Sequence, residues 1–135
     1  MSAGAVLSED LLERTKYSRD ASHYLLRPAA VARPRTEEEL RELLVRLQVE
    51  GRPFTFRSGG TSLSGQAVTD QVLIDTRRHF DAIEVLDDGH RVRAQPGASL
   101  RLVNARLRRH GRRLGPDPAS EVACTVGGVL ANNSS

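Results

Sequence analysis

The sequence predicts an α+β domain in which helices flank a small mixed sheet. Short apolar runs typical of strands alternate with segments of helical periodicity, and a β-hairpin pattern lies in the second half of the chain. The 135 residues are 39% hydrophobic and 27% charged, an ordinary globular balance with room for one modest domain. We divide the chain into an N-terminal arm, residues 1–27, and a domain over residues 28–135.

The arm is expected to contain one short helix followed by a loop. Ser8 can cap that helix, with Leu11 and Leu12 supplying its apolar face. Residues 15–27 show no periodicity, and their polar side chains favour a surface loop over a functional site.

A strand, a helix and a second strand then follow. Apolar residues around Val31 suit a brief strand between two prolines. Thr36 and Glu39 form a capping box, and the helix that they begin has one buried face and ends at Gly51 (Leu40, Leu43, Leu44 and Leu47). The second strand covers residues 54–56. This order normally gives parallel pairing of the two strands through a right-handed crossover.

The second half of the chain adds a strand, a hairpin and a helix. Residues 72–75 read as a buried strand, and residues 83–94 as a hairpin in which Gly89 takes a positive φ. Ser99 can cap a helix that ends at Gly111 and buries one apolar face (Leu100, Val103 and Leu107).

The loop after the strand at 54–56 has the composition of an anion-binding site. Its glycines allow φ > 0 and can turn backbone N–H groups toward one point, and its hydroxyls add donors. A phosphate or pyrophosphate fits such a loop, and a tight surface turn is the alternative. The two common phosphate-binding glycine motifs are absent, so the site belongs to another class. The candidate residues are Arg57, Ser58, Gly59, Gly60, Thr61, Ser62 and Gly65.

A second glycine-rich stretch lies near the end of the chain. Gly127 and Gly128 open an apolar turn where a helix can begin, and free N–H donors there suit an anion or a carbonyl-rich ring. A plain turn is again the alternative. An apolar, glycine-rich run makes a poor free tail, so we expect the chain to be part of a longer protein.

Composition narrows the function classes further. The net charge is +3, and the arginines at 101–113 have no aromatic residues between them, which favours a solvated helix face over a nucleic-acid patch. The single cysteine, Cys124, excludes an internal disulfide and a cysteine-based zinc site, and we expect it to be a small buried filler. No segment approaches the ~20 apolar residues of a membrane span, so we expect a cytoplasmic protein.

No catalytic residue and no metal ligand is predicted. The four histidines fall on loops, at a strand end and at the end of the arginine-rich helix, where a surface position is the usual one (His23, His79, His90 and His110).

Four stretches in order resemble the FAD-linked oxidases of the vanillyl-alcohol oxidase type, whose FAD-binding domain is also called the p-cresol methylhydroxylase (PCMH) type. They are residues 33–40, 57–66, 115–120 and 124–133. The likeness runs from about Tyr17 onward and is greatest to the branch of D-lactate, glycolate and 2-hydroxyglutarate dehydrogenases. It implies that residues 28–135 hold the first α/β subdomain of this FAD-binding domain and the start of its second, incomplete at the C-terminus.

The resemblance also implies how FAD would be held. The loop 57–65 would wrap the pyrophosphate, while a second set would line the isoalloxazine and ribityl side (Pro116, Asp117, Ser120, Thr125, Gly127, Gly128 and Asn132). Ser58 stands where many relatives have a third glycine and therefore needs an allowed backbone angle. Relatives that bond FAD covalently have a histidine where this chain has Thr61, so FAD is expected to be non-covalent.

By the same resemblance, the chain is the FAD-binding portion of an enzyme that oxidises a small 2-hydroxy acid by hydride transfer to flavin. The substrate would bind through a C-terminal part, and these residues alone would be inactive. The alternatives are an alcohol or sugar oxidase or reductase of the same superfamily, and a non-catalytic module that binds an acidic partner.

Overall fold

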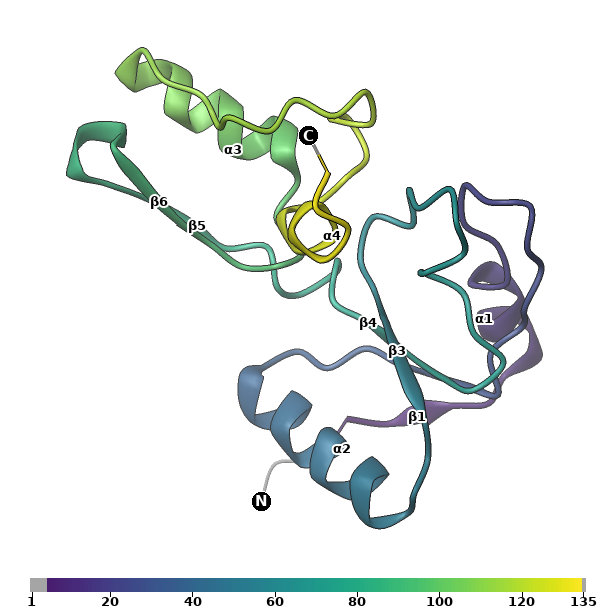
Figure 1. Cartoon of the computed structure of the whole chain (residues 1–135). Coiled ribbons are helices and arrows are strands. Elements are labelled where there is room, and N and C mark those ends of the chain that lie inside the picture. Colours follow the sequence, from purple (N-terminus) through teal and green to yellow (C-terminus); the bar gives the residue numbers. More distant parts are fainter. Residues whose placement is uncertain (1–4, 135) are drawn as a thin grey trace.

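A computed structural model describes residues 5–134; residues 1–4 of the expected arm and residue 135 lie outside the described residues. The chain forms two lobes that meet near α4 (Figure 1). The first lobe is a four-stranded sheet with helices, in the order β1-β2-β4-β3. The second is a two-stranded hairpin with the remaining helices. The mixed sheet and flanking helices agree with the α+β class predicted from the sequence.

The first lobe is built from the N-terminal half of the chain. Its strands are β1 (Leu7–Ser8), β2 (Ala30–Ala32), β3 (Phe54–Arg57) and β4 (Val72–Asp75), and its helices are α1 (Leu11–Lys16) and α2 (Glu37–Val49). Strands β2 and β3 both pair with β4 in parallel, and β1 pairs with β2 in antiparallel. The carboxyl ends of β2, β3 and β4 therefore lie at the same edge of the sheet.

Helix α2 confirms the predicted capping and burial. The Thr36 Oγ1 accepts a hydrogen bond from the Glu39 N–H at 3.1 Å, and the Glu39 carboxylate accepts one from the Arg35 N–H at 2.8 Å. Leu43 and Leu47 are fully buried against the sheet, where they meet small and β-branched strand residues (Ala32, Val72 and Ile74). Gly51 ends the helix with φ +62°.

Three expectations for the first lobe are wrong. The strands on either side of α2 are parallel but do not pair, because β4 lies between them. Ser8 does not cap α1, since it pairs with Val31 in the sheet; Asp10 is the cap, and its carboxylate accepts from the Glu13 N–H at 2.9 Å. The leucines of α1 are also largely exposed, Leu11 at 59% and Leu12 at 66%.

The second lobe contains the predicted hairpin and helix. Its elements are β5 (Ile83–Leu86), β6 (Arg91–Ala94), α3 (Leu100–Leu107) and α4 (Val126–Ala131). Gly89 has the expected positive φ, +85°, and Asp87 and Asp88 share the left-handed region. Ser99 caps α3 as predicted, and a 3₁₀ turn leads from α3 to Gly111. The lobe's core joins the hairpin to α3 (Ile83, Ala98, Val103 and Leu107).

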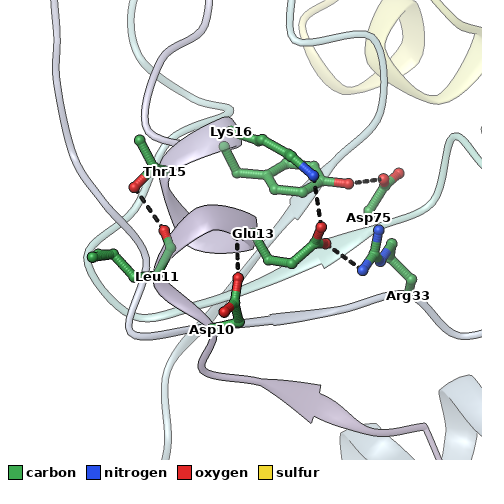
Figure 2. A network of polar contacts seen from close by, with 8 residues as sticks. Asp10, Leu11, Glu13, Thr15, Lys16, Arg33 and Asp75 are labelled. Atoms are coloured by element: carbon green, nitrogen blue, oxygen red, sulfur yellow. Dashed lines mark hydrogen bonds and ion pairs between the residues drawn. The ribbon is translucent and has the colours of Figure 1, made fainter.

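A network of polar contacts ties α1 to the carboxyl edge of the sheet. Figure 2 shows Glu13 between Lys16 and Arg33, with Asp75 beyond them. The Tyr17 hydroxyl donates to the Asp75 carboxylate at 2.6 Å, so the end of α1 is joined to the end of β4. The segment after α1 has no regular structure, but these contacts fix its starting point.

None of the helices within residues 5–134 has the length and apolar character needed to cross a membrane.

The Tyr17 contact predicts a specific loss of stability at alkaline pH. Burial, and then the hydrogen bond to Asp75, raise the pKa of Tyr17 from 10.0 to about 12; the charge of Glu13 acts in the same direction and that of Arg33 opposes it. Because folding favours the neutral phenol, the contribution of Tyr17 is fully present below pH 10 and is lost as the pH rises to about 12.

We therefore expect Tyr17→Phe to lower the free energy of unfolding by about 1–3 kcal/mol below pH 10 and by less near pH 12. Denaturant unfolding at the two pH values measures this, with Tyr24→Phe as the control. An equal loss at both pH values would contradict the assignment.

Candidate cofactor site

The two glycine-rich stretches line one cavity of about 450 Å³ at the carboxyl end of β3, beside α4. A cavity of this size is typical of small-molecule and cofactor sites. Several residues of each predicted set line it (Ser58, Gly59, Gly60, Thr61, Ser62, Thr125, Gly127, Gly128 and Asn132). Residues separated by more than sixty positions in the sequence thus share one surface.

The glycine loop has free backbone donors beside this cavity. Gly60 lines the cavity and has φ +66°, the left-handed conformation by which successive N–H groups of an anion-binding loop can face one point. Within residues 5–134, the N–H groups of Gly60, Thr61 and Ser62 find no intramolecular acceptor. Free N–H groups beside one another are the donors that a phosphate or pyrophosphate requires. The loop therefore fits an anionic group.

The far end of the loop is closed by its own side chains. The Ser62 hydroxyl donates to the Gln66 side-chain oxygen, and it accepts from the N–H groups of Ser64 and Gln66, each at 3.3 Å. Gly65, with φ +80°, lies against the Tyr24 ring, because a Cβ placed there would come within 2.5 Å of that ring. Ser62 and Gly65 thus shape the loop.

The first and second stretches touch directly. A Cβ on Gly59 would lie 2.7 Å from the Ala123 carbonyl oxygen, so this position accepts glycine alone without movement of backbone. Next to it the Thr125 hydroxyl, fully buried, donates to the Ser58 hydroxyl at 2.7 Å, and Ser58 donates to the Pro96 carbonyl at 3.3 Å. Ser58 itself avoids the left-handed region, as expected.

The beginning of α4 differs from the prediction of free donors. The Val126 and Gly127 N–H groups donate to the Ala98 and Pro96 carbonyls, both at 2.9 Å. Gly127 also lies so close to Pro96 that a Cβ would approach it to 2.6 Å. The first turn of α4 is therefore bound to the segment 96–98 within the second lobe. Of the two glycines, Gly128 is the one with open space beside it.

Five candidate residues lie away from the lining of this cavity, and Gly65, described above, is one of them. The Arg57 guanidinium points toward the segment after α1, where it donates to the Arg19 carbonyl at 2.7 Å. Asp117 lines a different hollow and pairs with Arg113 at 3.3 Å, and Pro116 precedes it in the same turn. Ser120 lines an adjacent hollow that shares Thr61, Ser62 and Asn132 with the cavity. Cys124 also borders that hollow and is buried, as expected.

Some lining residues were not predicted. Leu40 of α2 and Phe56 of β3 form an apolar wall, and Pro96 forms another part of the lining. Leu40 was predicted as a core residue, and Phe56 as an ordinary strand residue. The alternation along β3 was the available signal, because it leaves Phe54 and Phe56 on one face, where they are 40% and 46% exposed. The four histidines are all exposed and none lines the cavity.

A mixed α/β lobe with a glycine loop at a strand's carboxyl end, closed by a second glycine-containing segment, defines a domain that binds a phosphate-bearing cofactor. The chain belongs to the FAD binding domain family, which matches residues 28–135. Its donors fit that cofactor, since the free N–H groups suit a pyrophosphate and the apolar wall suits a ring.

Curated relatives include three enzymes. The chain is 33% identical over 118 residues to the glycolate oxidase subunit GlcD of Escherichia coli, covering 84% of this chain and 23% of that protein. It is 30% identical over 136 residues to D-2-hydroxyglutarate dehydrogenase of Pseudomonas putida, covering 96% and 13%. It is 32% identical over 105 residues to D-lactate dehydrogenase of Archaeoglobus fulgidus, covering 77% and 24%. The chain thus spans at most about a quarter of these relatives.

Solved structures show the same fold. Alkyldihydroxyacetonephosphate synthase superposes with a TM-score of 0.80 at 24% identity, covering 96% of this chain and 29% of that one. Cholesterol oxidase from Brevibacterium sterolicum superposes with a TM-score of 0.81 at 21% identity, covering 99% and 25%. The fold is that of the PCMH-type FAD-binding domain, as predicted.

Gly128 offers a test of the cavity that spares the fold. A Cβ there would meet only the Thr125 hydroxyl at 3.6 Å, an ordinary contact, while a longer side chain would fill the cavity. We expect Gly128→Leu to weaken FAD binding by about tenfold or more and to leave stability within about 1 kcal/mol of wild type.

Gly115→Leu is the matched control, because Gly115 has open space around it and lies outside the cavity. Flavin titration of the full-length apoprotein, with thermal unfolding alongside, measures both effects. Wild-type affinity in Gly128→Leu would show that FAD binds elsewhere. Gly60→Val is a less clean test, since its Cβ would press on the Arg57 guanidinium at 2.6 Å.

Proposed function

We propose that this chain is the FAD-binding portion of an FAD-dependent oxidoreductase that oxidises a small 2-hydroxy acid. The observation that carries the proposal is the meeting of both glycine-rich stretches at one cavity, joined by the hydrogen bond from Thr125 to Ser58. The names of the relatives, which act on glycolate, D-lactate or 2-hydroxyglutarate, support the substrate class.

In this proposal the chain's role is to hold and orient FAD. The free N–H groups of Gly60, Thr61 and Ser62 receive the pyrophosphate, and Gly128 and Asn132 face the flavin side from α4. The Ser58 and Thr125 hydroxyls keep the two sides of the cavity at a fixed separation. When FAD is bound, its flavin ring supplies the redox chemistry by accepting a hydride.

The substrate and any acid or base are proposed to come from residues outside this chain. The lining includes no histidine and no carboxylate, so it offers no group suited to take the proton of a hydroxy acid. We therefore expect the 135 residues alone to bind FAD weakly and to have no turnover. A cytoplasmic location is part of the same proposal.

Anaerobic titration of the full-length protein tests the substrate class. We expect D-lactate, glycolate or D-2-hydroxyglutarate to bleach the visible absorption of the flavin, because hydride transfer reduces it. Bleaching by an alcohol or a sugar, with no response to any of the three acids, would favour the alternative enzyme of the same superfamily. A purified protein without flavin absorption would reject the flavoenzyme altogether.

We further propose that FAD is held without a covalent bond. Thr61 lines the cavity at the position where covalently linked relatives have a histidine, and a threonine hydroxyl without an adjacent base is a poor nucleophile. Cys124, the other candidate, is buried in a small apolar cluster with Leu100 and Val129.

Acid precipitation of the full-length holoprotein should therefore leave the yellow colour in the supernatant. Colour retained by the pellet would show a covalent link. Thr61→Ala and Cys124→Ser, each precipitated in the same way, would then identify the attached residue by releasing the flavin.

A further inference from the structure

Arg57 is the one charged side chain of the glycine loop, yet its guanidinium is directed to backbone oxygens of the protein. It donates to the Arg19 carbonyl at 2.7 Å and, at longer distances, to the Ala67 and Tyr17 carbonyls at 3.3 and 3.4 Å. It also lies over the Tyr17 ring, 5.6 Å from its centre. One side chain thus connects the start of the loop with residues on both sides of it.

The segment 17–24 meets the loop at two more points. The Ala21 N–H donates to the Gly60 carbonyl at 3.1 Å, at the residue whose positive φ turns the loop. The Tyr24 ring lies against Gly65, where the loop ends. Contacts at Arg57, Gly60 and Gly65 therefore hold the beginning, the middle and the end of the loop from the side of this segment.

The segment is itself anchored. The Tyr17 hydroxyl donates to Asp75, which is 92% buried at the end of the central strand β4, and the Asp75 carboxylate also accepts from the Arg77 N–H at 2.8 Å. Arg14 of α1 donates from its Nε to the Pro28 carbonyl at 2.6 Å. The segment therefore fixes the position of the loop relative to the sheet.

Two carboxylates of the protein favour the positive charge of Arg57. Burial lowers the pKa of Arg57, and the nearby carboxylates of Asp20 and Asp75 oppose that shift by favouring the cation. Burial acts to raise the pKa of Asp20, but hydrogen bonds from Ser22 and Ala67 and the charge of Arg57 together lower it, so this carboxylate is charged at neutral pH. The Arg57 guanidinium thus has backbone carbonyls at Nη1 and the charges of two carboxylates that favour its present position.

We propose that segment 17–24 is a brace for the FAD loop and that Arg57 is a positioning residue, which holds the loop in its binding shape through backbone carbonyls. This inference rests on the proposed FAD site and differs from the role expected from the sequence, in which Arg57 was a ligand of the pyrophosphate. Tyr17 and Asp75 are part of the same arrangement, because their hydrogen bond fixes segment 17–24 to the end of β4.

Arg57→Lys separates the two roles, because lysine keeps the charge, while its shorter side chain brings no nitrogen to the place from which the Arg57 Nη1 donates to all three carbonyls. A brace predicts that this variant binds FAD about tenfold or more weakly in titrations of the full-length apoprotein. It also predicts faster amide hydrogen exchange over residues 58–65 without any FAD present. Arg78→Lys, an exposed arginine at the same edge of the sheet, is the matched control and should match wild type in both measurements.

The salt dependence of FAD binding gives an independent reading. If Arg57 bound the pyrophosphate directly, it would add to FAD binding a charge interaction that salt screens. If Arg57 only holds the loop in shape, it adds no such interaction. In Arg57→Gln the brace predicts weaker binding with an unchanged salt dependence. Binding by Arg57→Lys equal to wild type, or a reduced salt dependence in Arg57→Gln, would overturn the proposal.

Tyr17→Phe provides a milder variant that keeps the ring under Arg57 and removes only the bond to Asp75. We expect it to show a smaller loss of affinity and faster exchange over the same loop; unchanged exchange would contradict the anchoring role. Gly128→Leu distinguishes a failure of the proposed FAD site from a failure of the brace. If it binds FAD normally the proposed site is wrong, and if it loses FAD while Arg57→Lys does not, only the brace is wrong.

Discussion

The close approach of two backbone segments, at Gly59 and at residues 123–125, is the constraint on which this structure depends. Any side chain on Gly59 would collide with the Ala123 carbonyl, so the sheet lobe and the second lobe could not meet. Since each lobe supplies one wall of the cavity, the site exists only while this contact holds. At Gly59 the absence of a Cβ is what matters. At Gly60 and Gly65 glycine is favoured for a different reason, because the backbone there has a positive φ.

A second layer of contacts acts on the same loop from the opposite side. The polar groups of α1 and its following segment are directed at the carboxyl edge of the sheet, where Asp75 and Arg57 end neighbouring paired strands. The buried Asp75 carboxylate is tolerated there because it accepts two hydrogen bonds. Ala5 and Leu7 pack in the core of the first lobe and β1 pairs with β2, while the rest of the arm is joined to the domain largely through polar interactions.

The local features could be predicted from the sequence because short-range physics determines them. The capping by Thr36, the leucine face of α2 and the hairpin turn at Gly89 all follow from residues within one or two turns of one another. The order of strands could not be predicted, because nothing local in residues 72–75 shows that they insert between two earlier strands. The loop at 57–65 and the segment at 125–132, which the resemblance brought together, both line the cavity, whereas Pro116, Asp117 and Ser120 do not. The direction of the Arg57 side chain depends on the backbone carbonyls of residues 17, 19 and 67. Such contacts between distant residues cannot be predicted from their spacing in the sequence.

The central position of β4 also determines how this chain can acquire its structure. Neither β2 nor β3 has a parallel partner until residues 72–75 are present, so the sheet must close two long connections before it gains its parallel ladder hydrogen bonds. The β5–β6 hairpin needs only a short turn, and hairpins of this kind form within about 1–10 μs. The hairpin can therefore form before the parallel pairs, which follow when β4 docks between β2 and β3. During synthesis on the ribosome, the leucine face of α2 lacks its contacts with Val72 and Ile74 until β4 has emerged.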